Sequence, residues 1–476
     1  MVGRKIIQGG MGVGVSDWRL ARAVSQLGQM GVVSGTGLGV VLARRLQQGD
    51  PDGHLRRALA HFPIPGVAAR VRERFFVPGG KADDQPFNLA PMPNLQSDGL
   101  AAEMIVVANF VEVYLAKEGH DGVVGANYLE KVQIPTLPSL FGAMLAGVDY
   151  VLMGAGIPRF IPGILDRLAL GLPVELKTDV HDAQAGETYL SQFDPAKFCG
   201  PTLPAPTLRR PKFLAIISSA TLAMTLARKS NGKVDGFIVE GATAGGHNAP
   251  PRGPQELNDR GEPQYHLRDE ANLEKIRALD LPFWLAGGCA SPEKLAEALA
   301  AGASGIQVGT AFAFCDESSI EAKIKQQVRE LARAGHADVF TDPLASPTGF
   351  PFKVVRLAES MSEPEFYERR TRICDVGYLR QAYRRPDGKV GYRCAAEPEE
   401  QYLKKGGQRA DTVGRKCICN ALFATIGLAQ TKATPEGLQT ERCLITAGND
   451  VTDLARLFPA GQSSYTAADV VTYLLS

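Results

Sequence analysis

Eight short apolar runs, most of them followed by a glycine-rich turn and a helical pattern, constrain the fold of this chain most. The runs begin near residues 5, 31, 122, 149, 213, 236, 283 and 305. They are apolar throughout rather than alternating, which is typical of parallel strands buried on both faces. Eight such units in succession predict an α/β protein with a (β/α)8, or TIM, barrel over residues 1–352. An open doubly wound sheet is the alternative, but its phosphate turn normally follows the first strand, whereas glycine-rich turns here also crowd the last strands.

Two stretches interrupt or follow the repeat. Residues 173–211 are rich in proline and are interpreted as an insertion before the fifth strand. Residues 353–476 lie beyond the barrel and contain five of the eight cysteines. We therefore expect a C-terminal appended region, either a small domain or a set of elements packed on the barrel.

The composition is that of an ordinary globular protein. Of the 476 residues, 45% are hydrophobic and 22% charged, and the formal net charge is +1. This balance gives no general attraction to nucleic acid or to an anionic membrane, so neither partner is expected. The chain also lacks a secretory pattern and a run of about 18 apolar residues, which favours a cytoplasmic protein without a membrane span.

Two strand ends late in the chain predict an anion site. One apolar run ends at Gly287 and Gly288, and Ser291 is positioned to cap the helix that follows. The next run ends at Gly309 and Thr310. Backbone N–H groups at adjacent strand ends bind phosphate readily, and barrels commonly place phosphate after their last two strands. The alternative is that these glycines serve only tight turns.

A histidine follows another glycine-rich turn. The sixth run ends at Glu240, and Gly245 and Gly246 directly precede His247. The absence of side chains before His247 suggests that a flat or anionic ligand lies against the backbone, with the imidazole beside it. The alternative is a turn histidine whose hydrogen bonds are satisfied by backbone.

The order of these motifs resembles a known superfamily. The motifs are QGGMGVGVS, GVVSGTG, GANYL, GAGIP, EGATAGGH, AGGC and QVGT, read from residue 8 to residue 310. In this order they are similar to the nitronate monooxygenases, formerly called 2-nitropropane dioxygenases, and to the related FMN-dependent enoyl-acyl-carrier-protein reductases. The resemblance covers roughly residues 5–350.

The resemblance implies a barrel that binds FMN at the carboxyl ends of its strands. His247 matches the active-site histidine of the family, and Asn127 would hydrogen-bond the flavin. The cofactor-binding residues that it implies, together with those at the neighbouring strand ends, are Gly10, Met11, Asn127, Glu240, Gly245, Gly246, Gly287, Gly288, Gln307, Val308, Gly309 and Thr310. FMN is expected rather than FAD, because the two phosphate turns suit one terminal phosphate and no early dinucleotide fingerprint is complete.

The motifs leave the substrate open. The first interpretation is oxidation of a small nitronate or nitroalkane by O2. One alternative is NAD(P)H-dependent reduction of an enoyl thioester, including the trans-acting type of polyketide and polyunsaturated fatty acid synthases. A third is a flavin-binding subunit without turnover. Nitronate oxidation and enoyl reduction both need one polar group beside a flat ring, so the motif does not separate them. The substrate is expected to be a small molecule or an acyl thioester. The oligomeric state is open.

The C-terminal cysteines suggest a possible metal. Cys374, Cys394, Cys417 and Cys419 could hold Zn²⁺ or an iron–sulfur cluster. The only close pair is C-x-C, which differs from the two C-x₂-C knuckles of a zinc ribbon. Reduced cysteines packed in the appended region are the alternative.

Overall fold

The computed structural model describes residues 4–95, 99–201, 203–434 and 437–476. A sheet of eight parallel strands forms the barrel, in the order β1-β10-β9-β8-β7-β4-β3-β2. The ring closes between β1 and β2, where the N–H of Gln8 donates to the carbonyl of Met30 at 2.9 Å and the N–H of Met30 donates to Ile6 at 3.1 Å. The predicted (β/α)8 barrel is confirmed, and each predicted apolar run supplies one strand.

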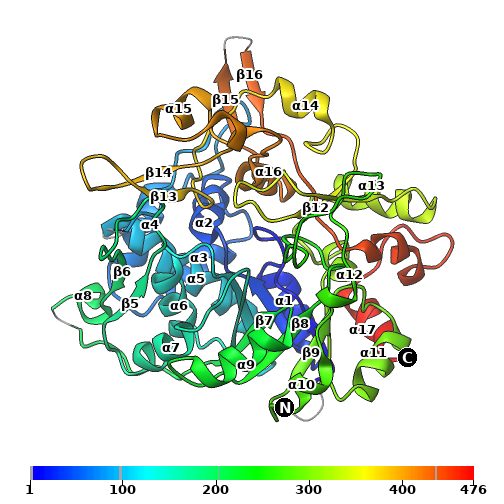
Figure 1. Cartoon of the computed structure of the whole chain (residues 1–476). Coiled ribbons are helices and arrows are strands. Elements are labelled where there is room, and N and C mark those ends of the chain that lie inside the picture. The colour runs from blue at the N-terminus through cyan, green and yellow to red at the C-terminus, as the bar shows by residue number, and fades with distance from the viewer. Residues whose placement is uncertain (1–3, 96–98, 202, 435–436) are drawn as a thin grey trace.

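One or more helices follow most strands of the barrel, and four of them, α2 to α5, lie between β2 and β3 in the chain (Figure 1). The strands are β1 (Ile6–Gln8), β2 (Gly31–Ser34), β3 (Val124–Leu129), β4 (Tyr150–Gly154), β7 (Lys212–Ile217), β8 (Gly236–Glu240), β9 (Phe283–Ala286) and β10 (Gly305–Val308). The helices are α1 (Trp18–Gln26), α2 (Leu38–Gln47), α3 (His54–Ala60), α4 (Val67–Phe75), α5 (Gly99–Lys117), α6 (Thr136–Leu145), α7 (Ile161–Ala169), α9 (Ala220–Lys229), α10 (Leu273–Arg277), α11 (Pro292–Ala300), α12 (Thr310–Ala313) and α13 (Ala322–Arg333). Ser291 caps α11 as predicted, because its Oγ accepts the N–H of Lys294 at 3.2 Å.

The remaining elements lie outside the eightfold repeat. The stretch 173–211, in which residue 202 falls outside the described residues, holds the antiparallel pair β5 (Val174–Lys177) and β6 (Leu190–Phe193) and helix α8 (Pro195–Cys199). The later elements are β11 (Val339–Asp342), β12 (Phe352–Val355), α14 (Pro364–Arg369), β13 (Gln381–Arg384), β14 (Val390–Arg393), α15 (Glu399–Lys404), α16 (Ile418–Thr425), β15 (Thr431–Thr434), β16 (Gly437–Thr440) and α17 (Ala467–Leu475). Three 3₁₀ helices complete the description: η1 (Leu267–Asp269), η2 (Arg409–Thr412) and η3 (Asn449–Leu457).

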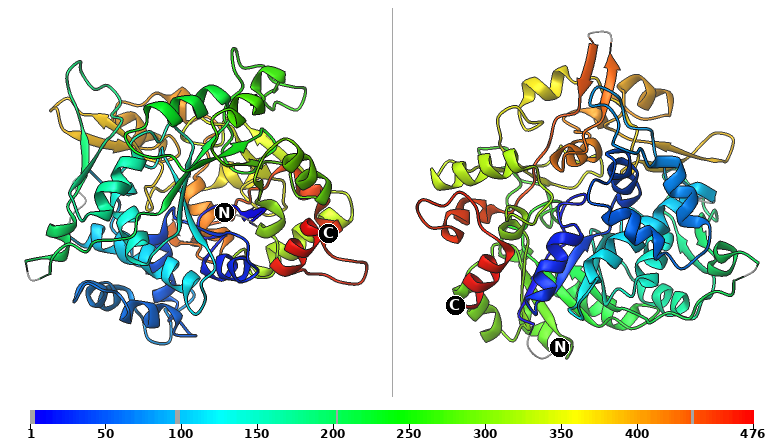
Figure 2. Two further views of the ribbon diagram at one scale, coloured as in Figure 1. Left: turned by 90° about the horizontal axis from the view of Figure 1, so that it is seen from below. Right: turned by 180° about the vertical axis from the view of Figure 1, so that it is seen from behind.

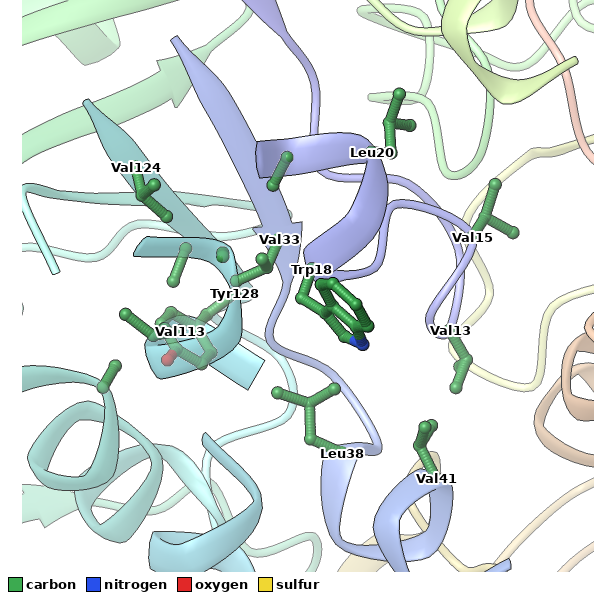
Figure 3. Packing of buried hydrophobic residues seen from close by; sticks show 14 of the residues in the cluster. Val13, Val15, Trp18, Leu20, Val33, Leu38, Val41, Val113, Val124 and Tyr128 are labelled. Carbon is green, nitrogen blue, oxygen red and sulfur yellow. The ribbon is translucent and has the colours of Figure 1, made fainter. Parts of the chain in front are cut away.

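Two apolar layers hold the barrel together. The smaller cluster includes Ile7, Leu152 and Trp284, one from each of three barrel strands. The larger cluster includes strand and helix residues, and Figure 3 shows Trp18 at the start of α1 close to Val33 and Leu38. The strands are therefore covered by apolar side chains on both faces, which explains why their sequences do not alternate.

The chain after residue 352 joins the same core. Helix α17 contacts α1 and α11, and η3 contacts α13. Figure 2 shows the C-terminal helix beside the first helix of the barrel. Helix α17 thus lies in the outer helical layer beside the seam where β10 meets β1, and the last segment of the chain packs against its beginning.

Helix α5 is 19 residues long and mostly apolar. Among the helices of the described residues, it is long and apolar enough to cross a membrane. However, 72% of its most apolar window is buried inside the fold. Such burial is typical of the core helix of a globular barrel, and α5 packs against α1, α2 and α6.

Candidate active site

One cavity of about 220 Å³ opens at the carboxyl ends of the barrel strands. All thirteen residues predicted from the sequence line it. They are Gly10, Met11, Asn127, Glu240, Gly245, Gly246, His247, Gly287, Gly288, Gln307, Val308, Gly309 and Thr310. The structure therefore brings them to one place, at the end of the barrel where TIM barrels build their sites. Their roles in binding and catalysis stay predictions.

His247 is an uncharged group in this cavity. Its Nε2 lies 2.7 Å from the hydroxyl of Ser346, and its ring meets Phe352 edge-on at 4.8 Å between centroids. Burial lowers the pKa of His247 to about 3, and the positive charge of Lys131 acts in the same direction. The imidazole is therefore neutral at pH 7 and offers one N–H donor and one acceptor. Its bonding partner is a side chain rather than the backbone.

Glu240 is the second titratable group at the end of β8. Burial raises the pKa of its carboxyl to about 7. Within the described part of the chain, no hydrogen bond or ion pair engages this carboxyl. A carboxyl without a protein partner that titrates near neutrality is available to a ligand, so its position fits the predicted contact with a cofactor or substrate.

The two glycines before His247 have different structural reasons. A Cβ on Gly245 would lie 2.8 Å from the carbonyl carbon of Ala447 and from the nitrogen of Gly448, so the missing side chain makes room for the C-terminal segment. Gly246 has a φ of 80°, in the left-handed region that favours glycine. Its N–H donates to Thr446 Oγ1 at 2.8 Å. The missing side chain of Gly245 is thus required by another part of the chain, whereas the approach of a flavin to this backbone stays a prediction.

The turns after β9 and β10 present a cradle of backbone donors. Gly287 and Gly288 have φ values of 95° and 63°, which side-chain-bearing residues rarely adopt. Among the described hydrogen bonds, none is donated by the N–H groups of Gly287, Gly288, Cys289, Gly309 or Thr310. Free N–H groups on residues that line one cavity can bind an anion. This cradle fits the phosphate of FMN.

Polar side chains also line the cavity. The Oε1 atom of Gln307 is buried and has no hydrogen-bond partner among the described residues, so a ligand donor would satisfy it. A Cβ on Gly10 would collide with the side chain of Asn127, so the glycine gives Asn127 its place. The backbone N–H of Met11 donates to Ser16 Oγ at 2.8 Å, so this group is not free for a ligand. Only the rest of Met11 is available to a ligand.

The C-terminal region supplies a roof that the sequence analysis did not anticipate. We use the term roof for its apolar residues that line the cavity: Val376, Leu379, Ile418, Leu422 and Phe423, with Tyr378 and Cys419 beside them. Residues 446–448 and Asp450 line the same cavity. Thr446 is 200 positions from its partner Gly246, so no local pattern signals this contact.

The cavity lacks a fixed positive charge. Among the described residues that line it, there is neither a lysine nor an arginine. His247 is neutral, and the other ionisable lining groups are acids, thiols and Tyr378. Any anion bound here must therefore rely on backbone N–H groups or on polar side chains.

The predicted metal has no support in the structure. The four C-terminal cysteines named above line a separate small cavity, and Cys394 and Cys417 are buried. The described residues contain no group of three or more His, Cys, Asp or Glu that could hold a metal ion. All eight cysteines are free thiols. The alternative, reduced cysteines packed in the appended region, describes their surroundings.

A closed parallel barrel with an anion cradle at its carboxyl end defines a class of phosphate- and cofactor-binding barrels. Within this chain, residues 207–339 match the family model for nitronate monooxygenase. The nitronate monooxygenase of Paraburkholderia phytofirmans is 32% identical over 154 residues, which cover 31% of this chain and 36% of that protein. The predicted resemblance to the nitronate monooxygenases is thus confirmed for residues 207–339, which contain β7 to β10 and His247. The match spans little more than a third of the curated relative.

Three solved structures are similar to this chain at lower identity. FabK from Thermotoga maritima is 15% identical, with 99% of this chain and 91% of that chain covered and a TM-score of 0.49. A nitroalkane oxidase from Streptomyces ansochromogenes is 15% identical, with 99% and 94% covered and a TM-score of 0.47. The enoyl reductase domain of MlnA from the macrolactin cluster of Bacillus amyloliquefaciens is 11% identical, with 98% and 91% covered and a TM-score of 0.45.

Proposed function

We propose that the protein is an FMN-dependent oxidoreductase whose site is the cavity at the carboxyl end of the barrel. The proposal is supported by the cradle of free N–H groups at Gly288, Gly309 and Thr310, and by the nitronate monooxygenase match over residues 207–339. The backbone would hold the phosphate of FMN, and Asn127 and Gln307 would face its polar parts.

We propose that the substrate is a neutral enoyl thioester. The observation that carries this choice is a cavity without lysine or arginine under an apolar roof. Placing an unpaired anion in such surroundings costs several kcal/mol, whereas a neutral acyl chain gains from contact with apolar side chains. A nitronate is an anion, and the neutral imidazole of His247 would not compensate its charge.

The residues of the chain have defined roles in this reaction. When bound and reduced by NAD(P)H, FMN supplies the hydride. His247 donates a hydrogen bond to the thioester carbonyl, where negative charge develops, and such donors are usually worth about 10²–10³ in rate. Ser346, which is fully buried, fixes the ring through Nε2 and leaves Nδ1 without a partner among the described residues. The roof excludes water from the carbonyl.

Nitronate oxidation by O2 is the second candidate. It is favoured by the family match and by the 32% identity with the nitronate monooxygenase of P. phytofirmans. In this reaction His247 would take a proton from a nitroalkane or donate a hydrogen bond to the nitronate. Lys131, whose charge lowers the pKa of His247, would add positive charge near the ring, although it does not line the cavity and burial lowers its own pKa to about 7.

A parallel substrate assay tests the proposal. The purified flavoprotein is given enoyl thioesters with NADH or NADPH, and separately propionate-3-nitronate or alkyl nitronates with O2. We expect bleaching of the flavin by NAD(P)H and turnover of the enoyl thioester. Oxygen uptake with nitronates and no thioester reduction would favour the second candidate. Flavin binding without turnover in either assay would favour the non-catalytic alternative.

A further inference from the structure

A short C-terminal segment ties two turns of the barrel together. The N–H of Gly448 donates to Thr310 Oγ1 at 2.9 Å, and the N–H of Asn449 donates to the carbonyl of Thr243 at 3.0 Å. Together with the bond between Gly246 and Thr446, these contacts join the turn after β8 to the turn after β10. We call residues 446–450 the clasp. The clasp therefore lies against one half of the proposed phosphate cradle.

The clasp carries an acid, Asp450, whose carboxyl group has an oxygen without a hydrogen-bond partner among the described residues. Asp450 lines the same cavity as Gly288 and Thr310. Its Oδ1 atom is buried and has no hydrogen-bond partner among the described residues. A buried polar oxygen left unpaired is costly, and this one faces a cavity proposed to hold a ligand. The ligand is the group that can satisfy it.

We propose that Asp450 is a cofactor ligand that, in its protonated form, donates a hydrogen bond to the phosphate of FMN in the cradle. This inference rests on the proposed FMN site. The oxygens of a phosphate dianion only accept hydrogen bonds, so a carboxyl group that bonds to one must carry the proton. The bond also explains how a phosphate is bound in a cavity whose described lining contains no lysine or arginine.

The electrostatic surroundings agree with a protonated acid. Burial raises the pKa of Asp450 and outweighs a hydrogen bond from the Thr310 hydroxyl, which lowers it; the charge of Asp453 raises this pKa further, and that of Lys353 lowers it. The other titratable groups that interact with it are Cys289 and Tyr465, whose own pKa values are raised by burial. An ionised Asp450 would repel the phosphate dianion. The affinity for FMN should therefore fall as the pH rises and the proton is lost.

Flavin affinity of the full-length apoprotein tests the role of Asp450. The dissociation constants of FMN and riboflavin are measured by fluorescence from pH 6 to pH 9, for the wild type, Asp450→Asn and the control Asp52→Asn, an exposed acid outside the cavity lining. Asparagine keeps a donor but does not titrate. We expect the wild type to lose about 10-fold or more of its FMN affinity over this range relative to Asp450→Asn. Riboflavin lacks the phosphate and should not distinguish the two proteins, and the control should follow the wild type.

Other results would overturn the inference. Equal pH profiles for the wild type and Asp450→Asn would show that the acid does not act on the phosphate. Weaker binding of both FMN and riboflavin by Asp450→Asn at every pH would show instead that a carboxylate accepts from the ribityl hydroxyls. Should the asparagine variant not fold, Asp450→Ser removes the titrating group with a smaller side chain. A wild type that binds no FMN would overturn the proposed site itself, and this outcome differs from the others.

Discussion

At the scale of single residues, burial shifts the pKa values of His247 and Glu240 in opposite directions. His247 is neutral because burial and the charge of Lys131 both lower its pKa. Glu240 has the opposite shift, since burial raises its pKa to about 7. A change of activity near neutral pH would therefore report Glu240, or Lys131, whose pKa burial lowers to about 7, rather than His247. Hydrogen bonding by His247 should be constant between about pH 5 and pH 9.

Replacing His247 with alanine should lower kcat/KM on the true substrate by about 10²-fold while FMN stays bound. The reason is that the backbone cradle holds the cofactor, whereas the imidazole addresses the substrate. Ser346→Ala, which keeps the ring and removes its anchor, should cost about 10-fold. Steady-state kinetics and the flavin content of each purified variant measure these effects. Folded His247→Ala without flavin would make His247 a cofactor anchor instead.

Glu240→Gln should change how the stability of the apoprotein depends on pH. The folded pKa of Glu240 lies above its ordinary value of 4.5, so its contribution is present below that value and is lost as the pH rises through about 7. Relative to the variant, the wild type should lose about 2 kcal/mol of unfolding free energy between pH 5 and pH 9. This loss is smaller than the pKa shift alone would give, because the cavity admits water. Denaturant unfolding at both pH values measures this loss. Parallel curves for the two proteins would contradict it.

At the scale of elements, the fit between the turn after β8 and the clasp is steric. Gly245→Ala should cost about 2–3 kcal/mol and weaken FMN binding, because its Cβ would lie 2.8 Å from the backbone of Ala447 and Gly448. Gly246→Ala is the matched control: its Cβ meets nothing within 4 Å, and only the left-handed φ is strained, for about 1 kcal/mol. Thermal unfolding and flavin titration compare the two. Equal effects would argue that steric contact with the clasp is unimportant.

Elements with a local signal could be predicted, and those without one could not. Each barrel strand is apolar because it is buried on both faces. Ser291 caps α11 through a hydrogen bond whose two residues are only three positions apart in the sequence. Nothing near Thr446 or Asp450 indicates that they approach Gly246 and Thr310, because such contacts depend on the closed barrel. The number of C-terminal cysteines suggests a metal, but the described residues form no group that could hold one.

At the scale of the whole molecule, the C-terminal region and the barrel share one hydrophobic core. Helix α17 contacts α1 and α11, and α16 contributes Ile418 and Phe423 to the same cluster as Trp18. The clasp and the roof also belong to this region. We therefore predict that the C-terminal region does not unfold independently of the barrel, although it follows the barrel in the sequence.

Two neighbouring residues of α17 test this prediction. Leu474 is 1% exposed and Leu475 is 46% exposed, so both truncations to alanine remove the same atoms from different surroundings. Leu474→Ala should lower the unfolding free energy by about 2–4 kcal/mol, and Leu475→Ala by less than about 0.5 kcal/mol. The fluorescence of Trp18, at the start of α1, and hydrogen exchange of the β4 and α16 amides should report the Leu474→Ala loss together. If exchange in α16 rose while β4 and the Trp18 signal were unchanged, the C-terminal region would be a separate folding unit, and the site would depend on docking rather than on one cooperative fold.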